Sequence, residues 1–137
     1  MTIYETPVPR EARFSRLAAG VMRFVILELT LATALIHLSL GGTLFTLNGL
    51  GYLGFALAYL ASAVLPMPFA QALSWLPRVG LGLYAAATIG AYVFIGPYFV
   101  LGWVTKGIEL AIVGLVAVEL LADARGFAKV TPGGEDL

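Results

Sequence analysis

The sequence predicts an all-α fold, a transmembrane up-down four-helix bundle in which residues 1–137 form a single domain. Composition is the first reason, because 60% of the residues are hydrophobic and only 12% are charged, about half the charged share of a typical soluble domain. A soluble fold could not cover such a chain with polar surface. The other reasons are four consecutive apolar stretches and a one-sided distribution of basic residues.

The four apolar stretches cover residues 21–40, 44–65, 79–95 and 101–122. A helix needs about 20 residues, at 1.5 Å each, to cross the ~30 Å hydrocarbon layer of a bilayer, and each stretch approaches that length. Gly41-Gly42 predicts a minimal turn after the first helix, and Gly96-Pro97 breaks the third. We therefore expect two tight helical hairpins.

The connection between the second and third helices is longer, because Pro66, Pro68 and Pro77 interrupt it. Residues 69–76 lie between these prolines and include Trp75, a residue type that favours the headgroup region of a bilayer. We expect them to form a short amphipathic helix at the membrane interface.

Basic residues set the expected orientation. Four arginines precede or open the first helix, one lies in the middle connection, and Arg125 and Lys129 follow the fourth helix. With four crossings, all seven residues fall on one side of the membrane, and only Lys106 falls on the other. This bias predicts a multi-pass protein of the inner (plasma) membrane with both termini cytoplasmic. Residues 1–18 are then a cytoplasmic N-terminal segment, and residues 126–137 a polar, frayed C-terminal tail. The five other arginines are Arg10, Arg13, Arg16, Arg23 and Arg78.

Small residues recur at helical spacing in the last three stretches, each set on one narrow face. Membrane helices gain little from apolar burial against each other, so small residues that let backbones approach closely are expected at helix contacts. These faces predict the packing surfaces within the bundle. The sets are Gly54, Ala58 and Ser62, then Gly82, Ala86 and Gly90, then Gly107, Ala111 and Gly114.

Polar residues near the outer end of the bundle form a candidate cluster of His37, Asn48, Lys106 and Glu109. Each ionisable group at the bilayer centre costs on the order of 2.5–3.5 kcal/mol on insertion scales, so it needs a partner, a cavity or a role. Lys106 and Glu109 are three residues apart, which favours a local ion pair. His37 is expected to bond Asn48, Glu109 or a backbone carbonyl.

Two further carboxylates, Glu28 and Glu119, lie in the cytoplasmic half of the predicted spans, each about five residues inside an arginine, Arg23 and Arg125 respectively. Glu28 is either a proton or cation site or a structural group. It lies about 160° around its helix from Thr30, so the alternatives are that it faces the surroundings of Arg23, another subunit or a neighbouring helix.

Polar and aromatic stripes on the first three helices are candidates for lining a ligand slot. An apolar pocket with a few polar groups suits an isoprenoid, a quinone or a lipid. The tyrosines can equally fill the bundle and bond neighbouring helices. The residues are Thr33, Tyr52, Tyr59, Tyr84, Thr88 and Tyr92.

Several function classes find no support. A formal net charge of zero argues against nucleic-acid binding, and the chain has no cysteine. It has neither a glycine-rich phosphate loop nor the motif of a serine, cysteine or metal-dependent enzyme. We expect no metal site and no cofactor. The single histidine leaves one alternative open, because the imidazole of His37 can ligate haem iron or a pigment.

Three segments resemble a group of small bacterial and archaeal four-helix integral membrane proteins with no assigned function. They are residues 36–42, residues 47–54 and residues 105–109, which together carry His37, Asn48, Lys106 and Glu109. The resemblance implies the four-helix fold and the grouping of these residues. The chain is also loosely similar to small multidrug transporters, which carry a glutamate on the first of four helices.

We therefore expect a non-enzymatic subunit or scaffold that docks to itself, as a homo-oligomer, or to a larger membrane complex in contact with lipid. It would hold a lipid or isoprenoid ligand. The alternatives are a small proton-coupled transporter or ion-binding bundle, using Glu28 or the His37 cluster, and a haem or pigment carrier.

Overall fold

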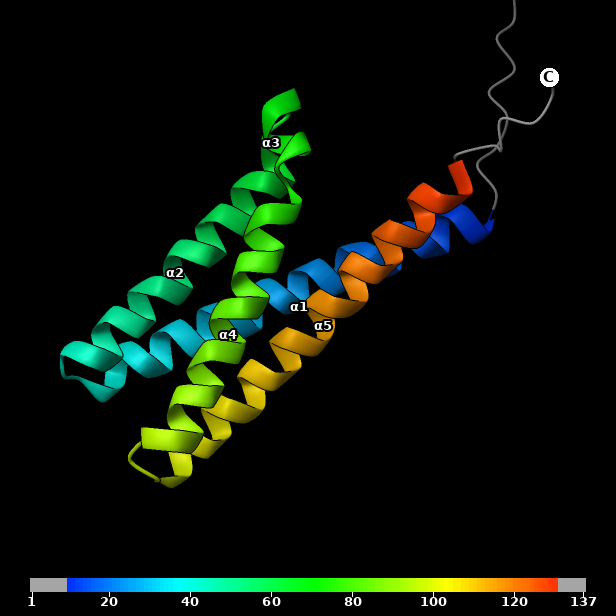
Figure 1. The fold of residues 1–137 in the computed structure, drawn as a ribbon. Coiled ribbons are helices and arrows are strands. Elements are labelled where there is room, and N and C mark those ends of the chain that lie inside the picture. The colour runs from blue at the N-terminus through cyan, green and yellow to red at the C-terminus, as the bar shows by residue number, and fades with distance from the viewer. Residues whose placement is uncertain (1–9, 131–137) are drawn as a thin grey trace, which may run out of the picture.

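The structure is a computed structural model that describes residues 10–130, with side chains except those of residues 10–14, 70 and 126–130. Over this part of the chain the fold has four long helices, one short helix and no strand, which confirms the predicted all-α class (Figure 1). The helices are α1 (Arg10–Leu40), α2 (Thr43–Val64), α3 (Pro68–Ala72), α4 (Trp75–Ile95) and α5 (Val100–Val130).

The four long helices run up and down and pack in a ring. α1 contacts α2 and α5, and α4 contacts the same two helices, so α1 and α4 occupy opposite corners. Both hairpins lie at one end of the bundle, whereas α3, the start of α1 and the end of α5 lie away from them (Figure 1).

The tight hairpins follow from local backbone chemistry. α1 ends at Leu40 and α2 begins at Thr43, and the two glycines between them have φ angles of 69° and 80°, which a residue with a Cβ rarely adopts. α4 ends at Ile95, immediately before Gly96-Pro97. Proline lacks the backbone N–H that a helix needs. Both predicted turns are confirmed.

Helix boundaries differ from prediction at the other end of the bundle. α1 begins at Arg10, inside the predicted N-terminal segment 1–18, and α5 continues to Val130, inside the predicted polar tail 126–137. A polar helical turn can continue in water once the apolar part has nucleated the helix. Residues 1–9 and 131–137 lie outside the described part.

The middle connection is shorter than predicted, because only Pro68–Ala72 forms a separate helix and Trp75 already belongs to α4. Pro77 falls in the first turn of α4, where its missing N–H would have had no intrahelical partner. The predicted short helix over residues 69–76 is therefore divided between two helices.

The bundle is apolar outside and partly polar inside. Large apolar side chains are exposed on all four long helices, whereas eight polar or charged residues are buried. In the described part of the chain, three helical segments are long and apolar enough to cross a membrane: Ser15–Leu40, Thr43–Val64 and Trp75–Ile95. α5 is not among them, and it carries three of the buried charged residues, Lys106, Glu109 and Glu119.

The predicted packing faces of small residues are wrong for α2 and α5. A Cβ added at Gly54, Gly107 or Gly114 would meet nothing within 4 Å, so these glycines approach no other helix. Close approach occurs instead at Gly51, beside the Tyr84 ring, and at Gly102, beside the Tyr92 ring. Gly49, beside Leu38 and the Ala34 carbonyl, and Gly80, beside the Phe55 ring, also lie close to their neighbours.

Candidate functional site

The outer polar cluster is centred on the Glu109 carboxylate of α5, which is 0% exposed. Its Oε2 accepts a 2.5 Å hydrogen bond from Lys106 Nζ and a 2.9 Å bond from Thr88 Oγ1 of α4. The Lys106 side chain is only 8% exposed, so this i,i+3 pair is buried rather than solvated. A buried carboxylate is tolerable only with such charged and hydrogen-bonding partners.

His37 of α1 faces the second oxygen of the same carboxylate. Its Nδ1 lies 2.9 Å from the Thr33 carbonyl oxygen; because a carbonyl can only accept, Nδ1 carries a hydrogen. Nε2 lies 3.6 Å from Glu109 Oε1. In the neutral tautomer both of these atoms are acceptors. Among the described residues, Glu109 Oε1 has no hydrogen-bond partner, and neither does the buried Thr33 Oγ1.

Two tyrosines extend this network across α2 and α4. Tyr52 Oη lies 2.8 Å from Thr88 Oγ1, and the Tyr52 ring stacks on the His37 ring with centroids 5.6 Å apart. Tyr84 Oη donates a 2.7 Å hydrogen bond to Asn48 Oδ1. The Tyr52 and Tyr84 rings meet edge to face at 4.9 Å. Helices α1, α2, α4 and α5 each contribute to one connected polar layer.

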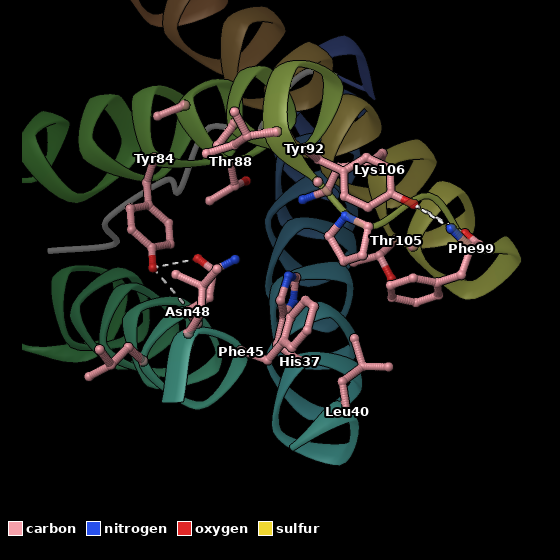
Figure 2. Close-up of a pocket in the computed structure, with 18 residues that line it drawn as sticks. His37, Leu40, Phe45, Asn48, Tyr84, Thr88, Tyr92, Phe99, Thr105 and Lys106 are labelled. Carbon is pink, nitrogen blue, oxygen red and sulfur yellow. Dashed lines mark hydrogen bonds between the residues drawn. The ribbon is translucent and has the colours of Figure 1, made fainter. Parts of the chain in front are cut away.

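A pocket of about 420 Å³ opens beside this layer, at the end of the bundle that carries the hairpins. Figure 2 shows side chains from α1, α2, α4 and α5 surrounding it. Most of its lining is apolar, including Leu40 and Phe45, and its polar side chains include His37, Asn48 and Lys106. An apolar cavity with a few converging polar groups is the usual design of a small-molecule site.

Tyr92 of α4 closes the pocket on the α5 side. Its hydroxyl donates to the Phe99 carbonyl oxygen at 3.1 Å and accepts from the Phe99 backbone N–H at 3.0 Å (Figure 2). Lys106 Nζ lies 5.5 Å from the centre of the Tyr92 ring, a cation–π distance. These bonds fix the tyrosine against the loop that follows α4.

A second buried layer lies toward the other end of the bundle, around Glu119 of α5. Arg23 Nε of α1 donates to Oε1 at 2.8 Å, Tyr59 Oη of α2 donates to Oε2 at 2.8 Å, and Arg78 Nε of α4 lies 3.5 Å from Oε1. Arg78 also bonds Asp123 at 2.5 Å. This carboxylate ties all four long helices together.

The structure brings three of the four predicted cluster residues, His37, Lys106 and Glu109, into direct proximity. Asn48 lines the same pocket and bonds Tyr84 instead of His37. Of the six predicted lining residues, Tyr84, Thr88 and Tyr92 line the pocket. The other three are buried in helix packing: Thr33, Tyr52 and Tyr59.

The two predicted intramembrane carboxylates differ. Glu28 is exposed on the outer face of α1 and forms no ion pair with any described residue. Glu119 is buried, and its partners are Arg23 of α1 and Arg78 of α4 rather than Arg125, the nearby arginine of its own helix.

Sequence reasoning missed the buried role of Arg78 and the bond between Thr88 and Glu109. Arg78 was counted as a basic residue of a loop, whereas it lies in the first turn of α4 and points inward. One signal was available, because Thr88 and Glu109 lie at corresponding depths on either side of the second hairpin.

No group of three or more histidine, cysteine, aspartate or glutamate side chains suited to a metal ion occurs among the described residues. Both nitrogens of His37 already face acceptors, the Thr33 carbonyl and the Glu109 carboxylate. Ligation of a haem iron through Nε2 would require that carboxylate to move.

The chain matches no protein-family model, no curated protein and no solved structure. The resemblance of residues 36–42, 47–54 and 105–109 to a group of four-helix membrane proteins therefore stays a prediction. The geometry of the pocket and its polar layer carries the functional argument.

Proposed function

We propose that the chain is a multi-pass inner-membrane protein that crosses the bilayer four times, with both termini in the cytoplasm. α5 is the fourth crossing, because its charged Lys106, Glu109 and Glu119 point into the bundle while Leu110 and Val118 face outward. An apolar exterior around buried ion pairs suits lipid as the solvent. The basic residues that open α1 and close α5 support the orientation.

Within this bundle, we propose that the pocket holds the head and the first part of the chain of a lipid-like or isoprenoid ligand. The observation that carries this proposal is the apolar 420 Å³ pocket with His37, Asn48 and Lys106 converging on it. Asn48 Oδ1 accepts from Tyr84, which leaves the amide N–H₂ of Asn48 as a donor toward a ligand oxygen. The volume is within the range of roughly 300–1,000 Å³ that is usual for small-molecule sites.

The protein acts in this proposal as a non-enzymatic binding subunit. Glu28 supports the idea of a subunit: it lies near the middle of the Ser15–Leu40 segment and is exposed. A carboxylate in that position is costly against lipid tails, and a protein partner or a second copy of the chain would cover it. Light scattering in mild detergent tests this point, since a strictly monomeric protein that co-purifies with nothing contradicts it.

The ligand proposal is tested by binding of decanol to the full chain in lipid nanodiscs, with empty nanodiscs as the blank. Ala87→Trp should abolish binding, because Ala87 lines the pocket and an indole would fill part of it. Ala86→Trp is the matched control, since Ala86 and Ala87 are both exposed on α4 but only Ala87 is part of the lining. Equal loss in both variants, or no saturable binding to the wild type, contradicts the proposal.

A further inference from the structure

We propose that the pocket takes the anionic head of an amphiphile and that binding draws one proton from solution onto His37. This inference rests on the proposed ligand site and names the charge class of its ligand. Two features support it. The basic side chains of the buried layer line the pocket while their carboxylate partner does not, and the charges of the layer balance when the pocket is empty.

The charged groups of the layer are distributed unevenly around the pocket. Lys106 and His37 form part of the lining, whereas Glu109, the counter-ion of Lys106, is 0% exposed and does not. A ligand head therefore meets the ammonium and the imidazole, with the carboxylate behind them. An anionic head is favoured there and a cationic head is not.

Charge balance then requires a proton. With neutral His37, the empty layer holds one positive charge on Lys106 and one negative charge on Glu109, so its net charge is zero. A bound anionic head alone would leave a net charge of minus one in a low-dielectric site, which is expensive. One proton on His37 Nε2 returns the net charge to zero. An N–H bond forms, and no bond of the ligand breaks.

The geometry provides the place for this proton. Nε2 and Glu109 Oε1 are 3.6 Å apart, and Oε1 has no donor among the described residues. In neutral His37 the hydrogen is on Nδ1, beside the Thr33 carbonyl, so Nε2 carries none. A proton on Nε2 gives Oε1 a charged donor once the two atoms approach by about 0.7–0.9 Å, to the usual distance of a charge-assisted hydrogen bond. Ligand binding would thus satisfy a buried carboxylate oxygen.

The other titratable groups around His37 have their hydrogen bonds in place. Tyr52 of α2 pairs with Thr88, Tyr84 of α4 donates to Asn48, and Tyr92 of α4 donates to Phe99. Lys106 of α5 donates to Glu109 Oε2. Among the described residues near the pocket, His37 Nε2 and Glu109 Oε1 are thus the two facing acceptors that lack a hydrogen to share.

The test is calorimetry of the full chain in lipid nanodiscs with decyl sulfonate, whose charge is fixed, and decanol, which is neutral. Titrations in two buffers of different ionisation enthalpy count the protons taken up. We expect about one proton per sulfonate above the ordinary titration range of histidine, with affinity falling about tenfold per pH unit, and none for decanol.

Two variants separate the roles of the two side chains. Glu109→Gln leaves Lys106 without its counter-ion, so sulfonate should bind with no proton uptake and at least about tenfold more tightly at pH 8 than in the wild type. His37→Asn removes the titratable nitrogen, so sulfonate should bind weakly at every pH with no uptake. If His37→Asn does not fold, His37→Gln takes its place in the test.

Sulfonate binding to the wild type without proton uptake, or uptake that persists in a folded His37 variant, overturns this inference while the proposed ligand site stands. Failure of both decanol and sulfonate to bind the wild type overturns the ligand site together with the inference.

Discussion

Tyr59 donates a 2.8 Å hydrogen bond to Glu119 although 60 residues separate them in the chain. The same carboxylate accepts from Arg23 and faces Arg78, so each of the four long helices contributes one side chain to it. The arrangement fixes the rotation of every helix about its own axis, because a turn of one helix would carry its partner out of reach.

Replacement of Glu119 by leucine should lower the free energy of unfolding by about 3 kcal/mol, because the buried Arg78 guanidinium, the partly exposed Arg23 and the Tyr59 phenol lose their shared acceptor. The measurement is unfolding in mild detergent followed by circular dichroism. Tyr59→Phe should cost less, about 0.6–1.7 kcal/mol, the range of interhelical hydrogen bonds in membranes.

Glu28→Leu is the control for this prediction, since it also removes a carboxylate from a membrane segment but touches no described ion pair. An unfolding midpoint equal to that of the wild type is expected in detergent. Equal destabilisation by Glu28→Leu and Glu119→Leu would contradict the structural role assigned to Glu119.

The purified protein should be colourless. Haem or a metal-containing pigment would need His37 Nε2 as its ligand, and that atom faces the Glu109 carboxylate at 3.6 Å. The measurement is the visible absorbance spectrum of protein expressed in cells supplied with haem precursors. A strong absorbance band that disappears in His37→Asn would restore the cofactor carrier as the better interpretation.

The proposed topology predicts which engineered cysteines are accessible from each side of the membrane, against a background without native cysteine. Ser74→Cys lies between α3 and α4 and should react with an impermeant maleimide only from the cytoplasmic side. Ser39→Cys, near the first hairpin, should react only from outside. Labelling of both positions from the same side would contradict an up-down bundle embedded in a membrane.

The turns and the apolar spans could be predicted because they depend on local chemistry. Gly41-Gly42 supplies a backbone conformation that other residues avoid, and Gly96-Pro97 cannot continue a helix. The start of α1 at Arg10 and the end of α5 at Val130 could not be predicted in the same way. The extension of each helix to these residues is allowed by the local backbone chemistry but not required by it. The Lys106 and Glu109 pair was likewise predictable from spacing within one helix.

Contacts between residues on different helices are harder to predict from sequence, because they depend on the tilt and rotation of each helix. A helical wheel gives neither. Along the chain the arginine near Glu119 is Arg125, whereas the partners of Glu119 come from α1, α2 and α4. The rule for small residues also failed on α5, where Gly107 meets nothing and Gly102, outside the repeated pattern, lies against Tyr92. A glycine that makes room for a large side chain of another helix cannot be recognised from the residue spacing of its own helix.

This difference between two glycines of α5 gives a matched prediction. An added Cβ at Gly102 would lie 2.7 Å from Tyr92 Cζ and 2.8 Å from Cε2, whereas at Gly107 it would meet nothing within 4 Å. Alanine is the better helix former at both sites. Gly107→Ala should therefore keep or slightly raise stability, and Gly102→Ala should be about 1–3 kcal/mol less stable than Gly107→Ala through overpacking.

The same pair tests the pocket. In Gly102→Ala the Tyr92 ring must shift, which disturbs its two hydrogen bonds with Phe99 and the position of Lys106 beside it. Decanol affinity in nanodiscs should fall at least about tenfold in Gly102→Ala, equivalent to 1.4 kcal/mol, and stay unchanged in Gly107→Ala. Equal affinities in both variants would show that Tyr92 does not shape the site, and a ligand would then have to bind elsewhere on the bundle.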